Sequence, residues 1–278
     1  MSAVLSGTAQ RPLAARAPAS PTQPWVDASW VMAALFLVTL GALAVDERLL
    51  NGVSVWSKPL KFQASLALHF ATLALLARLL PEARRHARGF RAAVAWSTCA
   101  GLLEIAWIVL QAARGRASHF NEETVLEQVM YALMGVGALV LVAAPFLMGY
   151  WLWRDFGPGL RRDPLRLAAA LGLALSAVAT VVVAGYMSSI AGSHWVGNVT
   201  TDAGGLPLVG WSQRGGDLRV AHFFSSHGMQ FLPLLGYALR RRGQAGSIAV
   251  VAATLAWLAF TAAVFLQALG GRPLLVLG

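Results

Sequence analysis

The sequence is poor in charge, in cysteine and in lysine. Only 12% of its 278 residues are charged, against about 25% in an ordinary soluble domain. The single Cys99 can form no internal disulfide, so cysteine usage leaves the redox compartment undetermined. No glycine-rich phosphate loop is present, which argues against nucleotide hydrolysis by this chain. The two lysines, Lys58 and Lys61, lie far from the last apolar stretch, which argues against a retinal photoreceptor.

Long hydrophobic segments make up most of the chain. Hydrophobic residues make up 57% of it, and its mean hydropathy is +0.62. A helix of roughly 20 apolar residues crosses a bilayer core of about 30 Å. The composition therefore predicts an all-α polytopic membrane protein, a bundle of about seven transmembrane helices. The expected spans are residues 30–45, 62–80, 91–113, 125–153, 165–190, 218–239 and 247–269.

The segment before the first span differs in composition. Residues 1–24 are rich in alanine, proline and serine, and they show no periodic apolar pattern. Such a segment buries too little surface to fold, so we expect a disordered N-terminal tail. The first apolar stretch begins about 30 residues in and has no clear cleavage site after it, which favours a true span over a signal peptide. Residues 25–278 are expected to form a single seven-helix domain.

The basic residues predict an orientation. Fourteen of the 22 lysines and arginines lie on the side that includes the N-terminus, and eight lie on the other side. Because basic residues of short loops stay in the cytoplasm, we expect the N-terminus inside and the C-terminus outside. The net charge of +10 then belongs to helix ends beside anionic lipid, and nucleic acid is not an expected partner. This pattern fits the inner membrane of a bacterium.

Five of the six histidines fall in the outer half of the predicted bundle or in the loops outside it. Ionisable groups inside a bilayer are expensive and usually face a protein interior, so a one-sided layer suggests a metal, haem or proton site. The outer loops also mix polar residues, aromatics and glycines, which suits a structured lid. The role of the loop at residues 192–217 is left open. The histidines of this layer are His69, His119, His194, His222 and His227.

Helical rise predicts the depth of the polar groups within the spans. At 1.5 Å per residue, His69 and His227 both lie about 12 Å inside the outer end of their spans. His222 lies about 5 Å deep, and Glu104 lies about 15 Å deep on the third span. Three ionisable groups from three helices thus share one level.

Helical phase adds a second constraint. Ser65 and His69 are four residues apart and share a face, as His227 does with Gln230. A spacing of five separates His222 from His227 by about 140° around the helix. These two side chains are therefore badly placed to ligate one metal ion. On the fourth span Glu123 and Glu127 continue into a stripe of methionines, which suits either an entrance or ordinary packing; these methionines are Met130 and Met134.

The favoured function is a b-type haem protein for electron transfer. In this hypothesis His69 and His227 bind the haem iron from two helices, and His222 and Arg219 contact the cofactor, with Arg219 near the propionates. The chain has no Cys-x-x-Cys-His sequence, so the haem is not covalently attached. A membrane oxidoreductase of this kind exchanges electrons between a quinol in the bilayer and a periplasmic redox partner.

A zinc or non-haem iron enzyme, a hydrolase or oxygenase, is the first alternative. Its ligands are His69 and His227 with His222 or His119, and Glu104 acts as a ligand or as the catalytic general base. Seven spans, an internal N-terminus and the Ser65-x-x-x-His69 pattern resemble the alkaline ceramidase and adiponectin-receptor superfamily. That family carries His-x-x-x-His on its last span, whereas the later pair here is spaced by five on the sixth, so no membership is assigned.

The second alternative needs no metal. In a proton-coupled transporter, channel or assembly factor, Glu104 and the histidines form a proton relay through the bundle. Pro145 and Pro233 lie inside predicted spans, where they can bend the helices that line a path.

Overall fold

The computed structural model describes residues 20–189, 193–243 and 246–277. These residues form eight α-helices, two 3₁₀ helices and two pairs of short strands. In chain order the elements are α1 (Gln23–Val45), β1 (Leu49–Leu50), β2 (Val53–Ser54), α2 (Ser57–Leu76), η1 (Ala77–Leu79), α3 (Glu82–His86), α4 (Arg88–Ala113), α5 (Val125–Phe156), η2 (Gly157–Arg162), α6 (Pro164–Ser189), β3 (Trp195–Val196), β4 (Gly216–Asp217), α7 (Leu218–Arg241) and α8 (Ser247–Leu269).

The long helices follow the apolar stretches of the sequence. Each of the seven predicted spans corresponds to one long helix, although residue 190 of the fifth span lies outside the described residues. The largest difference is at the first span, where α1 begins at Gln23. Pro24 in the first turn favours a helix start there, and Gln23 Nε2 donates to Asp27 Oδ1 at 2.8 Å. Residues 23 and 24, expected in the tail, therefore belong to α1, and residues 1–19 lie outside the described part.

Six of the long helices in the described part are long and apolar enough to cross a membrane. They are α1, α2 together with η1, α4, α5 together with η2, α6 and α8. Their length and composition indicate an integral membrane protein. The helix α7 is not among these six, although it has 24 residues and lies within the same bundle. Its sequence carries an arginine, two histidines, two serines and a glutamine in its first four turns.

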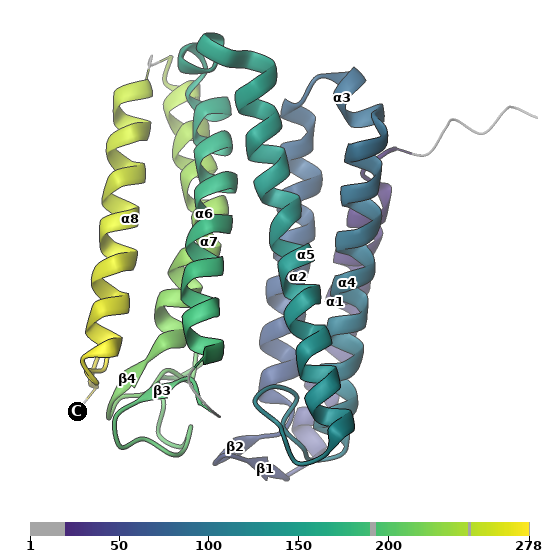
Figure 1. The fold of residues 1–278 in the computed structure, drawn as a ribbon, viewed down its shortest axis with the longest axis vertical. Coiled ribbons are helices and arrows are strands. Elements are labelled where there is room, and N and C mark those ends of the chain that lie inside the picture. The colour runs from purple at the N-terminus through teal and green to yellow at the C-terminus, as the bar shows by residue number, and fades with distance from the viewer. Residues whose placement is uncertain (1–19, 190–192, 244–245, 278) are drawn as a thin grey trace, which may run out of the picture.

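The long helices run side by side in one bundle (Figure 1). The helices α1, α2 and α4 pack together, as do α6, α7 and α8, and α5 joins the two groups by packing on α4 and α6. Both strand pairs lie at one end of the bundle, and α3 lies at the other. We call the end with the strands the cap end and the opposite one the arginine end. The described chain enters α1 at the arginine end and reaches its C-terminus at the cap end.

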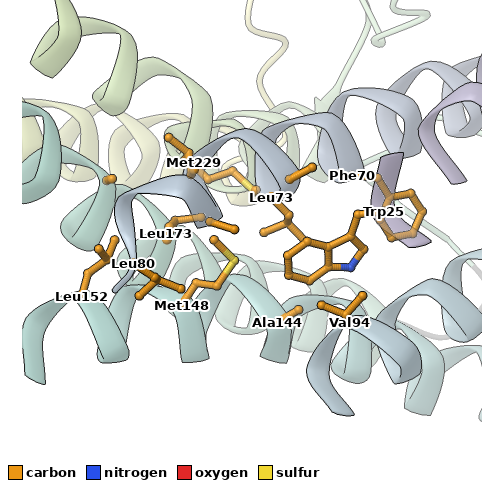
Figure 2. Close-up of a cluster of buried hydrophobic side chains, with 14 of the residues drawn as sticks. Trp25, Phe70, Leu73, Leu80, Val94, Ala144, Met148, Leu152, Leu173 and Met229 are labelled. Carbon is orange, nitrogen blue, oxygen red and sulfur yellow. The ribbon is translucent and has the colours of Figure 1, made fainter. Parts of the chain in front are cut away.

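The core fills the space between the two groups of helices. Figure 2 shows Trp25, Phe70, Leu73 and Met148 among the buried side chains of this cluster, and all four are 0% exposed. Trp25 Nε1 also donates to Ser97 Oγ at 2.9 Å, which fixes α1 against α4. Buried apolar surface of this kind stabilises the bundle by packing. Polar side chains inside such a core are costly to bury, so they point to a candidate functional site.

Two glycines allow close approach of the helices around α6. A Cβ atom at Gly149 would lie 2.7 Å from the carbonyl oxygen of Ala170, so α5 approaches α6 through this position. A Cβ atom at Gly228 would lie 2.6 Å from Ser176 Oγ and 2.3 Å from the Trp257 ring. Small residues at helix contacts of membrane proteins permit such short distances. Gly149 thus lets α5 approach α6, and Gly228 lets α7 pack closely against α6 and α8.

The loops at the cap end form a folded layer, which we call the cap and define as residues 46–56, 114–124 and 193–217. The loop before α7 meets the β1–β2 hairpin, because the amide of Asp202 donates to the carbonyl of Asn51 at 2.8 Å. Thr201 Oγ1 donates to the same carbonyl at 2.9 Å. Lys61 of α2 extends into this layer and donates to the carbonyl of Val209 at 2.8 Å. The cap thus covers one end of the bundle.

Candidate functional site

The junction between α2 and α7 is the place where two predicted ligands approach each other. The helix α2 packs on α1 and α4, whereas α7 packs on α6 and α8. A hydrogen bond from Gln230 Nε2 to Thr72 Oγ1, 3.2 Å long, crosses the junction. Thr72 follows His69 by three residues, and Gln230 follows His227 by three. Both helices start at the cap end, so this bond sets His69 and His227 at one level.

Hydrogen bonding determines which nitrogen of His227 is free. The hydroxyl of Thr72 donates to the carbonyl of Leu68 at 2.7 Å, so its oxygen accepts from the amide nitrogen of Gln230. The amide oxygen of Gln230 then faces His227 Nδ1 at 3.3 Å, and Nδ1 must be the donor. In a neutral ring Nε2 consequently carries the lone pair. The Phe223 ring, 4.3 Å away between centroids, lies beside the imidazole.

His69 presents an unused nitrogen inside the bundle. Its Nε2 atom is buried and has no hydrogen-bond partner among the described residues. Its ring meets Phe70 edge-on, with 5.5 Å between the ring centroids. Ser65, which the sequence places on the same helix face, is exposed. Buried polar atoms nearly always form a hydrogen bond or bind a metal, so this nitrogen is a candidate ligand atom.

The third histidine of these two helices, His222, lies nearer the cap. It is partly buried on α7, and it is close enough to His227 and His119 for their charges to interact. Its position between these two residues makes the layer continuous from the cap to the α2–α7 junction.

Glu104 and His119 form a carboxylate–imidazole pair beneath the cap. Glu104 Oε1 lies 3.5 Å from His119 Nε2, and the Glu104 side chain is only 6% exposed. The position of His119 follows from the loop between α4 and α5, where Ser118 Oγ lies 3.2 Å from its Nδ1. Trp107 of α4 fixes the same loop by donating to the carbonyl of Ser118 at 3.3 Å. Burial holds the pKa of His119 well below its usual value, and the nearby charges of Lys58 and His222 lower this pKa further.

Lys58 brings a positive charge to the same region. It lies in the first turn of α2, with its Nζ 5.7 Å from the centre of the Phe62 ring. Glu104 and Asp202 both interact with it electrostatically. In the described part of the chain, however, no carboxylate oxygen lies within 4.0 Å of its Nζ. Among the described residues, this amine is therefore not paired with a carboxylate.

Arg219 forms its ion pairs and a hydrogen bond with residues of the cap. Its guanidinium lies 2.7 Å from Asp202 and 2.7 Å from Asp217, and it donates to the carbonyl of Gly210 at 2.9 Å. His194 Nε2 lies 3.4 Å from Asp202 Oδ1, the same oxygen that Arg219 contacts. Arg219, expected beside a haem propionate, thus has two carboxylate partners from the protein itself.

Burial and charge shift the pKa values of this network. Burial alone would raise the pKa of Asp202, but the hydrogen bond with His194 and the charge of Arg219 outweigh it, so the pKa is lowered. The pKa of His194 is lowered chiefly by burial, against the opposing hydrogen bond to Asp202. Near neutral pH the network therefore has a charged carboxylate and a neutral imidazole.

The acidic stripe of α5 takes part in packing at the cap end. Glu127 is 2% exposed and pairs with Arg116 at 2.9 Å and with Arg114 at 3.4 Å. The hydroxyl of Thr124 also contacts its carboxylate, while the Thr124 side chain caps α5. Met134, further along the stripe, is buried in the main core. These contacts favour the interpretation that the stripe serves ordinary packing rather than lining an entrance.

Two further participants escaped the sequence reasoning, namely Thr72 as a partner of Gln230 and Lys58 as an unpaired cation. The signal for Thr72 was available, because it repeats on α2 the three-residue spacing that Gln230 has from His227 on α7. For Lys58 the sequence gives only its place among the outer basic residues, at the border of the second span.

Within the described ranges, no three side chains of histidine, cysteine, aspartate or glutamate are grouped in a way that would hold a metal ion. The predicted residues instead form a string of pairs, which runs from the Asp202–His194 pair through Glu104 and His119 to the α2–α7 junction. Neither a family model, nor a curated protein, nor a solved structure matches the chain.

Proposed function

We propose that this membrane protein binds a b-type haem between α2 and α7, with His69 and His227 as the two axial ligands, and that it transfers electrons. The observation that carries the proposal is the buried, unpartnered Nε2 of His69. It lies at the level of His227, whose Nδ1 is held by Gln230 so that its Nε2 is free. A hydrogen bond to the second ring nitrogen is the usual support of a metal-ligating histidine.

The number of ligands favours haem over a compact metal ion. A porphyrin supplies four nitrogens, so the protein needs to add only two axial side chains. A catalytic zinc ion takes about three ligands from the protein. The α2–α7 junction offers two histidines from two different helices that pack on separate neighbours, which suits a planar group inserted between them.

The proposal includes α7 as a seventh span. Its 24 residues reach about 36 Å, enough to cross the bilayer core. Phe231, Leu234 and Tyr237 are exposed on its surface and suit contact with lipid. Its histidines and Gln230 are only partly exposed, and Gln230 faces α2. Of the polar residues that lower the hydropathy of α7, His227 and Gln230 belong to the proposed site, whereas Arg219 belongs to the cap.

The proposed orientation follows from the charges. The arginine end lies in the cytoplasm and the cap end lies outside, in the inner membrane of a bacterium, because basic residues of short loops remain inside. The haem then lies in the outer half of the bilayer. From that depth it can exchange electrons with a quinol in the membrane and with a redox protein of the periplasm.

The test is an absorption spectrum of the detergent-purified protein, oxidised and then reduced with dithionite, with metal analysis of the same sample. We expect a Soret band that sharpens on reduction, and its loss in both His69→Ala and His227→Ala. The matched control is His86→Ala, because His86 is an exposed histidine of α3 at the arginine end. A colourless protein with stoichiometric zinc would contradict the proposal and favour the hydrolase, with Glu104 as general base.

A second candidate, a proton path without metal, is favoured by the string of ionisable pairs. His119 and Glu104 lie 3.5 Å apart, and His222 connects this pair electrostatically with His227. Proteoliposomes with a trapped pH-sensitive dye test it, since Glu104→Gln removes an ionisable carboxyl with little change of shape. Proton flux that is lost in this variant of a metal-free protein would establish the relay, and an equal flux would exclude it.

A further inference from the structure

A second polar cluster lies under the cap, apart from the proposed haem ligands. It consists of the ammonium group of Lys58, the carboxyl of Glu104 and the imidazole of His119. The three groups come from α2, from α4 and from the loop between α4 and α5. Glu104 and His119 are paired at 3.5 Å, and both interact electrostatically with Lys58. The cluster thus offers a hydrogen-bond donor and an acid–base pair to one ligand.

Aromatic rings surround the imidazole of this cluster. The Phe62 ring lies 5.7 Å from His119 between ring centroids, and the Tyr131 ring lies 6.1 Å away. Phe120 stacks against Tyr131 at 5.5 Å. On the far side of the carboxylate, a Cβ atom at Gly137 of α5 would lie 3.5 Å from Glu104 Oε2. Rings suit contact with a flat apolar ligand, and the polar groups give it an orientation.

We propose that Lys58, Glu104 and His119 form the binding site of a membrane quinol, a flat ring with two opposed oxygen atoms and a lipid-soluble tail. Lys58 donates a hydrogen bond to one ring oxygen. Glu104 and His119 accept from the hydroxyl groups. Phe62 and Tyr131 contact the ring. The identification of the ligand as a redox substrate rests on the proposed haem function.

The chemistry of the site balances as an oxidation of the quinol to the quinone. Two O–H bonds break, one proton moves to the imidazole of His119, and one moves to the carboxylate of Glu104. The two electrons leave one at a time. A haem held by His69 and His227 would accept each of them, and a periplasmic redox protein would take them onward. The cap end being outside, both protons are released there.

The test measures thermal unfolding of the full-length purified protein with and without decylubiquinol, under anaerobic, reducing conditions that keep the ligand in its hydroxyl form. A ligand that binds only the folded state raises the unfolding temperature as its concentration exceeds Kd. We expect a saturable rise in the wild type and at least a tenfold weaker apparent affinity in Glu104→Gln, in His119→Asn and in Lys58→Met. The matched control is Lys61→Met. The ammonium of Lys61 donates to the carbonyl of Val209 in the cap, so this variant keeps the affinity.

A second readout separates this proposal from the haem proposal. We expect decylubiquinol to reduce the haem of the wild type, and Glu104→Gln to retain the haem spectrum but lose this reduction. A protein without haem whose unfolding temperature still rises would leave the quinone site in place and overturn the haem. A haem protein that shows no rise with decylubiquinol, or an equal rise in all three site variants, would overturn the quinol site.

Discussion

The two ends of the bundle are both rich in arginine, but they use it differently. At the arginine end most of these side chains are exposed, and Arg240 lies 3.7 Å from Asp163. One tight pair is present there, between Arg84 and a single carboxylate, Asp155, at 2.7 Å. At the cap end Arg219 joins two carboxylates at 2.7 Å, and the side chain of one of them, Asp217, is 1% exposed. The exposed arginines of the first group are Arg78, Arg88, Arg91, Arg154, Arg161, Arg162, Arg240, Arg241 and Arg242.

The difference shows what each kind of charge does. An exposed arginine at a helix end is free to meet water or lipid headgroups, and it contributes little to the fold. A buried arginine between two carboxylates orders the chain around it, because removal of one partner leaves the others unpaired. In the cap, Arg219 makes such contacts with Asp202 and Asp217. The ionisable side chains of the candidate site lie in the half of the bundle that is next to the cap.

The largest expected effect comes from removing the guanidinium of Arg219. In Arg219→Leu the carboxylates of Asp202 and Asp217 lose their shared cation, so we expect the free energy of unfolding to fall by about 3 to 5 kcal/mol. The matched variant at the other end is Arg240→Leu, for which we expect a change below about 1 kcal/mol. Unfolding by SDS in mixed micelles measures both. Equal losses in the two variants would erase the contrast between the ends.

A smaller effect is expected from Gln230, which orients His227 and connects α7 to α2. In Gln230→Leu we expect haem affinity to fall about 10- to 100-fold, as for other residues that support a metal ligand. Gln63→Leu is the control, since Gln63 donates to Thr39 across α1 and α2 at 2.9 Å in a similar interhelical bond. Competition with a haem-binding apoprotein gives both affinities. An unchanged affinity in Gln230→Leu would remove this support role.

The smallest effect is a pH dependence confined to the cap. His194 has a lowered pKa in the folded protein, so folding favours its neutral form. Its contribution to the stability of the cap is therefore present above its ordinary pKa of about 6.5 and is lost as the pH falls. Asp202, whose folded pKa is also lowered, adds to this loss at more acidic pH. Between about pH 7.5 and pH 5, we expect amide protection factors in residues 193–217 to drop and those of residues 157–163 to stay constant.

His194→Gln is the variant that checks the origin of this pH response. It removes the titrating ring, so the drop in protection over the first part of the pH range becomes smaller. A parallel drop at both ends of the wild-type bundle would instead point to a general loosening of the fold.

The sequence predicted the helices well because a bilayer-spanning helix is encoded by local hydrophobicity. It missed the start of α1, where Gln23, Asp27 and Ser29 break the apolar run. Tertiary contacts stabilise that turn: Trp25 donates to Ser97 of α4, and Ser29 donates to the carbonyl of Ala67 on α2. That α7 crosses the membrane stays a prediction, because its polar residues keep it out of the six helices that are long and apolar enough to do so.

The candidate site was predictable in depth but not in partners. Helical rise places His69 and His227 at one level, and the Thr72–Gln230 bond agrees with that level. The partners of Arg219 and Glu104 depend on how the loops of the cap fold, which no periodicity in the sequence encodes. That His69 and His227 bind a cofactor stays a prediction.

The most direct measurement is the electron paramagnetic resonance spectrum of the oxidised, purified protein. Two imidazole ligands give low-spin ferric haem, so we expect a low-spin signal in the wild type. In His69→Gly and in His227→Gly the signal should become high-spin and return to low-spin when imidazole is added. A low-spin signal that is identical in the wild type and in both variants, or the absence of any haem signal, would contradict axial ligation by these two histidines.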